Sequence, residues 1–112
     1  MQAEKGVYVS VERNDAQGIF DRIGDGHRNA VKRPWNRNTD RSLRAMIEFA
    51  NHNGDCIISG ENGYYRPIPT DRKDQLEYKA YMAKERSKVR KMQMKETCMV
   101  VAYEARKAEC GL

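Results

Sequence analysis

The sequence predicts a small α+β domain followed by one long helix. Three observations lead to this class: apolar residues recur at helical spacing before residue 54, a hairpin pattern surrounds Asn62-Gly63, and no Gly or Pro interrupts residues 71–109. We divide the chain into an N-terminal extension (1–13), a folded domain (14–70) and a basic C-terminal helix expected to mediate oligomerisation (71–112).

Length and composition limit the class further. The chain has 112 residues, of which 39% are hydrophobic and 33% charged, which suits one small globular domain. No stretch approaches the ~20 apolar residues needed to cross a bilayer, so a transmembrane protein is excluded, and we expect no signal peptide. Three widely spaced cysteines, an odd number, fit reduced thiols in a cytoplasm better than a disulfide framework.

The first part of the domain predicts a short helix and an extended segment. Asn14 or Asp15 can cap a helix that runs to about Ile23, before Gly24 and Gly26 end it. The segment 29–33 is expected to be extended because Pro34 disfavours helix in the residue before it. A short strand at 7–11 is a further expectation. The buried stripe of the helix is Ala16, Ile19, Phe20 and Ile23.

A second helix and a hairpin follow. We expect Asn38 or Thr39 to cap a helix over about 40–53, with Gly54 ending it. The hairpin has strands 56–59 and 64–66, joined by a tight turn at 60–63. Trp35 is expected to close the core, and of Tyr64 and Tyr65 one should be buried and the other exposed. The inward stripe of the helix is Leu43, Met46, Ile47 and Ala50.

The C-terminal helix carries an imperfect heptad pattern. One helix over 71–109 would span about 55 Å, so it must bend back or find a partner, and we favour a partner, with homodimerisation as one option. Pairing could be parallel or antiparallel. The series is Tyr78, Met82, Glu85, Val89, Met92, Glu96, Met99 and Tyr103.

Positive charge is concentrated in two islands. Residues 27–44 and 84–95 each hold six Lys or Arg and one acid, although the whole chain carries only +5. Such islands indicate local contacts with anions, or solvated helix faces.

The order helix, extended segment, capped helix and hairpin is that of a winged helix-turn-helix, in which the helix before the hairpin enters the major groove. The first island coincides with this unit, which makes DNA the expected partner. Free amides in the first turn of that helix could also bind phosphate. The candidate DNA-binding residues are Arg28, Lys32, Arg33, Arg37, Asn38, Thr39, Arg41 and Arg44.

No catalytic or metal-binding pattern is found. Gly24-Asp25-Gly26-His27 lacks the Lys and the spacing of a phosphate loop. His27 and His52 are not spaced from each other or from the cysteines as metal ligands would be. We therefore expect a protein that is not an enzyme and uses no cofactor or metal.

Several runs of the sequence resemble small proteins encoded by phages and prophages of Gram-positive bacteria. They are residues 26–36, 40–47, 54–58, Gly63-Tyr64-Tyr65-Arg66-Pro67 and 83–87. The resemblance implies a winged-helix unit followed by a basic helix, a replication or regulatory role on DNA, and a location in the bacterial cytoplasm.

Two functions remain open. The first is a non-enzymatic DNA-binding protein. The alternative is a protein-interaction module, such as a phage adaptor or an inhibitor of a host protein, built on the same scaffold. The acidic turn at Glu61 and the short connection between 31 and 39, which leaves little room for a second helix, favour the alternative.

Overall fold

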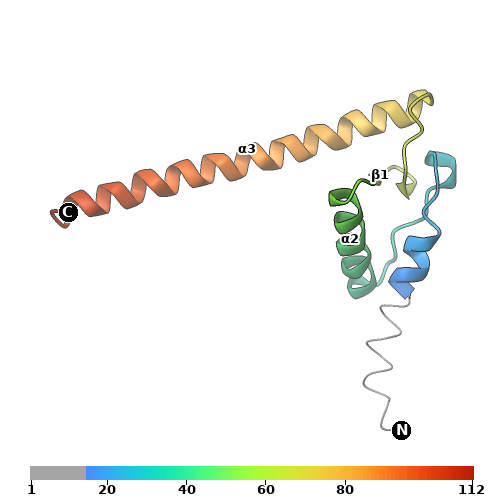
Figure 1. Cartoon of the computed structure of the whole chain (residues 1–112), viewed down its shortest axis with the longest axis horizontal. Coiled ribbons are helices and arrows are strands. Elements are labelled where there is room, and N and C mark those ends of the chain that lie inside the picture. The colour runs from blue at the N-terminus through green and yellow to red at the C-terminus, as the bar shows by residue number, and fades with distance from the viewer. Residues whose placement is uncertain (1–14) are drawn as a thin grey trace, which may run out of the picture. The chain divides into compact units, whose positions relative to one another are not determined.

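The computed structural model describes residues 15–112 (Figure 1). It has the α+β class that the sequence predicts, with an antiparallel two-stranded hairpin and a long C-terminal helix. The strand expected at 7–11 lies outside the described residues. In chain order the elements are a helical segment over 15–21, η1 (His27–Asn29), α2 (Arg37–His52), β1 (Ile58–Gly60), β2 (Gly63–Tyr65) and α3 (Arg72–Glu109).

The chain forms two compact units. One runs to Lys79 and the other is Ala80–Leu112, so the first two turns of α3 belong with the folded domain. Each unit is described below by itself.

The core of the first unit joins both amphipathic helices to the hairpin. The two stripes that the sequence predicts face inward: Ala16, Ile23, Leu43 and Ile47 are buried, and the remaining members pack against them. Ile57 and Tyr64 complete the cluster. The helical segment ends at residue 21, slightly earlier than expected, and Ile23 reaches the core from the following turn.

Helix α2 begins three residues before the predicted start. The cap is Asn36, not Asn38 or Thr39: its side-chain oxygen accepts the backbone N–H groups of Asn38 (2.9 Å) and Thr39 (3.1 Å). An asparagine just before the first turn satisfies amides that have no partner within the helix. The helix ends at His52, and Gly54 follows with φ +100°.

The hairpin is shorter than expected and gains a third pairing. Strand partners are Ile58 with Tyr65, Ser59 with Tyr64, and Gly60 with Gly63, which leaves a two-residue turn. On the free edge of β2, Val31 exchanges both backbone hydrogen bonds with Tyr64 (2.9 and 3.0 Å). The extended segment predicted before Pro34 therefore acts as a one-residue third strand.

Both hairpin tyrosines are buried, which corrects the prediction that one would be exposed. Tyr64 points into the core and Tyr65 is fully inaccessible. The second face of the sheet is covered because Tyr65 donates its hydroxyl to Glu77 of α3 (2.6 Å) and packs edge-on against the ring of His27, with centroids 6.5 Å apart. A hairpin alone would leave that face in water.

The first turns of α3 are attached to the domain by a buried carboxylate. Asp74 is completely buried and accepts the backbone N–H groups of His27 (3.2 Å) and Ile68 (2.8 Å), and its Oδ1 lies 2.6 Å from Nδ1 of His27. Burial opposes ionisation of Asp74, yet these hydrogen bonds outweigh it and lower its pKa below the usual value.

The loop after α2 is held by a second polar cluster. Asp55 pairs with Arg66 through two 2.8 Å hydrogen bonds, and Arg66 also donates to the carbonyl of Ile23. Asn51 binds both the N–H and the C=O of Ile57, as a neighbouring strand would. Asp55, Ile57 and Arg66 thus stabilise the fold, and all three lie in the runs of sequence that carry the family resemblance.

Candidate nucleic-acid interface

Two of the predicted DNA-contacting residues lie on α2 without an ion-pair partner among the described residues. Arg37 and Arg41 are exposed, one helical turn apart, and neither has an ion-pair partner in the described part of the chain. A guanidinium with all its donors open can bind a phosphate or a guanine edge in two-point geometry. These two side chains are the most available cations of the first island on this helix.

Two other predicted contacts, Arg33 and Arg44, converge on one carboxylate. Asp40 Oδ2 lies 3.3 Å from Nη2 of Arg33 and 3.2 Å from Nε of Arg44, while its Oδ1 accepts the hydroxyl of Tyr64 (2.9 Å). The guanidinium of Arg33 also lies over the Tyr64 ring, 5.6 Å from its centroid. Asp40 thus neutralises part of this charge and orients both arginines.

Thr39 does not belong to the interface that the sequence predicts. This residue is only 6% exposed and lies on the inward side of α2. The side chain of Asn38 is exposed, but the backbone amides of both residues are taken by Asn36. The expectation that these first-turn amides would bind phosphate is therefore wrong for those two groups, because the cap already satisfies them.

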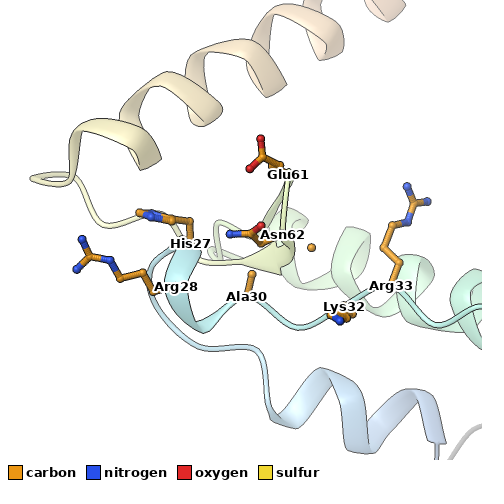
Figure 2. A pocket seen from close by; sticks show the side chains of 9 residues that line it. His27, Arg28, Ala30, Lys32, Arg33, Glu61 and Asn62 are labelled. Carbon is orange, nitrogen blue, oxygen red and sulfur yellow. The ribbon is translucent and has the colours of Figure 1, made fainter.

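A shallow groove holds the remaining predicted contacts. Arg28, Lys32 and Arg33 line it on one side, and the hairpin turn with Glu61 and Asn62 lines the other (Figure 2). Its volume is about 480 Å³. In Figure 2 the side chains of Arg28 and Arg33 lie at opposite ends of the groove. The groove adjoins α2, because Arg33 lines the groove and also pairs with Asp40 of this helix.

The acid at the hairpin turn is partly neutralised. Glu61 lies 3.2 Å from Nζ of Lys73, and its backbone N–H donates to Glu77. This surface pair is weak in free energy, but it places a cation beside Glu61, the one acid among the described residues that line the groove. Lys73 therefore reduces the repulsion between Glu61 and an anion in this groove, while the carboxylate of Glu77 stays beside the turn.

Trp35 is exposed, contrary to the prediction that it closes the core. It is 94% accessible and takes no part in the core cluster, which Tyr64 and the two helix stripes fill. It precedes the cap Asn36 and lines a hollow of about 370 Å³ beside the helical segment 15–21. An exposed indole next to free arginines can stack on a base or dock on a protein.

A cluster that the sequence did not reveal lies where η1 meets the start of α3. Ligand atoms of His27, Asp71 and Asp74 lie within 4.8 Å of one another, a spacing that suits a metal ion. However, Asp74 already accepts three N–H groups, and Oδ1 of Asp71 accepts the N–H of Asp74 (3.0 Å). These bonds explain the cluster as the N-terminal cap of α3 and its attachment to η1.

One functional residue could have been found from the sequence. Asp40 stands four residues before Arg44, a spacing that brings side chains together on a helix. The contact between Asp40 and Arg33 depends on the turn at Pro34-Trp35, and no periodicity indicates it.

Comparisons with protein families, curated proteins and solved structures found no match to this chain. None of the helices among the described residues combines the length and the hydropathy that a membrane span requires.

Proposed function

We propose that this protein binds nucleic acid, with duplex DNA as its target, through the N-terminal half of α2 and the adjoining groove. The observation that carries the proposal is the pair of exposed arginines without partners, Arg37 and Arg41, beside the exposed Trp35. Unpaired cations on a rigid helix bind phosphates at little cost, because no ion pair must first be broken.

The order of elements supports a winged-helix interpretation. A helix, a strand position at Val31, helix α2 and a hairpin follow one another, and Val31 pairs with β2. No second helix lies between Val31 and α2, and this departure from a complete helix-turn-helix favours the protein-interaction alternative. In this interpretation α2 is the recognition helix. A regulatory or replication role of the phage type rests on the sequence resemblance and belongs to the same proposal.

The groove adds contacts to the backbone of the duplex. Arg28 and Lys32 are exposed and, among the described residues, have no ion-pair partner. Together with Arg37 and Arg41 they offer about four phosphate contacts, and each contact steepens the salt dependence by about 0.9. We therefore expect a log–log salt slope of about −3 to −4 for one chain.

Fluorescence anisotropy of labelled random duplex DNA, titrated at several salt concentrations, tests the proposal. The double variant Arg37→Ala/Arg41→Ala should lose at least about tenfold in affinity, and its salt slope should become shallower by about 2 for each chain that contacts the DNA. Trp35 is the only tryptophan, so its emission reports contact next to α2.

The matched control is Arg72→Ala/Lys79→Ala, which removes the same charge from two exposed positions in the first two turns of α3, away from Trp35 and the groove. It should keep most of the affinity. If both double variants bind equally well, the proposed site is wrong. If the unaltered protein fails to bind duplex DNA even at low salt, the proposed function is wrong.

A second function is favoured by one specific observation. Trp35 and Phe49 are 94% and 71% exposed, which is unusual for large aromatic side chains without a partner. A protein-interaction module would bury them against another protein. Absence of DNA binding in a folded chain, with Trp35 still accessible to a quencher, is the result that this alternative expects.

A further inference from the structure

The second unit of the chain presents an exposed apolar stripe. Within α3, Val89, Met92, Met99 and Tyr103 are all more than half exposed. A hollow of about 650 Å³ follows this stripe between Met92 and Glu104. Exposed apolar surface of this extent on one helix indicates a binding surface.

The stripe has the spacing of a two-helix seam. From position 85 its members are separated by three or four residues, so they fall on one face of the helix. The seam covers about 39 Å of helix, which is enough for more than three heptads. Its members in order are Glu85, Val89, Met92, Glu96, Met99, Tyr103, Arg106 and Cys110.

We propose that α3 pairs with the α3 of a second copy of this chain, and that the two helices are antiparallel. The axis of the pair lies between Glu96 and Met99. Each Glu96 then faces Met99 of the partner subunit, and each Met92 faces Tyr103 of the partner subunit. The inference concerns the second unit and does not depend on DNA binding by the first.

Charge on the seam selects the antiparallel arrangement. In a parallel pair each seam residue faces its own copy, so Glu85, Glu96 and Arg106 would form three layers of like charge. In the antiparallel pair each of these residues faces an uncharged one: Glu85 faces Cys110 of the partner subunit, Glu96 faces its Met99 and Arg106 faces its Val89. No seam layer then opposes two charges of the same sign.

Charge beside the seam favours the same arrangement. Residues 84–95 hold six Lys or Arg and one Glu, and a parallel pair would place these two blocks together. The antiparallel pair places each block beside residues 100–111, where two basic and two acidic side chains balance.

The residues that flank the seam form one pair that favours the antiparallel arrangement and one pair that opposes it. On one flank Lys88, which pairs with Glu85 of its own helix (3.1 Å), comes beside Glu109 of the partner subunit. On the other flank Arg86 comes beside Lys107 of the partner subunit, but Lys107 is paired with Glu104 of its own helix (3.8 Å). Long exposed side chains can turn toward water, so this contact opposes pairing less than a charged seam layer would.

Sedimentation equilibrium of the full chain tests the pairing. We expect a concentration-dependent dimer, and Met99→Asp, which faces Glu96 of the partner subunit, should weaken it by about tenfold or more. Met94→Asp is the matched control, since Met94 is similarly exposed but lies away from the seam, and it should leave the dimer unchanged. A monomer at all concentrations, or equal effects of both variants, would overturn the proposal.

Disulfide trapping tests the direction. In full-length protein carrying Cys56→Ser and Cys98→Ser, Cys110 faces position 85 of the partner subunit. Mild oxidation should therefore link few chains, and adding Glu85→Cys should produce a covalent dimer joined between position 85 and Cys110. Glu85→Ser is the matched control. Rapid linkage of Cys110 to its own copy in the control would establish a parallel pair and overturn the inference.

Discussion

The buried polar side chains of this domain connect elements that are distant in sequence. Tyr64 bonds to Asp40 of α2, Tyr65 bonds to Glu77 of α3, and Asp74 bonds to His27. No buried side-chain nitrogen or oxygen among the described residues lacks a partner. Because an unpaired polar group in a core costs roughly 1–3 kcal/mol, these pairs determine how the helices sit against the hairpin.

Tyr64 makes the stability of the domain sensitive to alkaline pH. Burial, and then the hydrogen bond to Asp40, raise its pKa from 10.0 to about 12. Between these values the unfolded chain loses a proton that the folded chain keeps, so the free energy of unfolding falls as pH rises from 10 toward 12. Urea unfolding across this range should show the decline.

Tyr64→Phe provides the comparison for this pH effect. The variant loses the bond to Asp40 and should be less stable at neutral pH, but its stability should decline less steeply between pH 10 and 12. Tyr65, whose pKa is raised by burial and by Glu77, accounts for the decline that remains. An unchanged slope in the variant would show that Tyr64 does not cause it.

Residue-level predictions succeeded where burial follows a helical period. Leu43 and Ile47 repeat on one face of α2, and both are buried. They failed for Trp35 and Tyr65, since residue type alone does not tell whether another element covers a side chain. Tyr65 is covered only because α3, which starts seven residues later in the chain, packs its first turns on that face.

At the scale of elements, long periodic segments were predicted better than their ends. The expected helix 71–109 is α3 almost to the residue, because it lacks Gly and Pro throughout. The start of α2 was missed since Asn36, Asn38 and Thr39 are all good caps, and only geometry decides among them. The groove could not be predicted, because it needs the contact between β2 and Val31.

Gly63 allows the close approach that makes this contact. It has φ +122°, and a Cβ there would collide with the carbonyl of Val31. Gly63→Ala should therefore lower the free energy of unfolding by about 2–4 kcal/mol, measured by urea unfolding. Gly54→Ala is the matched control: φ is +100°, but nothing lies within 4 Å of the added carbon, so only the backbone strain of about 1 kcal/mol should appear. Equal losses at both positions would contradict the close approach.

For the whole molecule, the buried core residues and the exposed apolar stripe lie in different parts of the chain. Every buried residue among those described lies between positions 16 and 74. The exposed apolar stripe lies beyond Lys79, in the second unit. A chain that ends at Lys79 should therefore unfold at nearly the same urea concentration as the full protein. A chain that ends at Thr70 should not fold stably, since it lacks Asp74 and Glu77.

The same truncation separates the effect of each unit on DNA. The chain ending at Lys79 keeps the α2 face and the groove, so it should bind duplex DNA as a monomer with a salt slope of about −3 to −4. The full protein, as a dimer that engages DNA with both copies, should show about twice that slope, and it gains affinity because its second contact is intramolecular. Equal slopes for both chains, in a full protein shown to be dimeric, would mean that only one copy contacts DNA at a time.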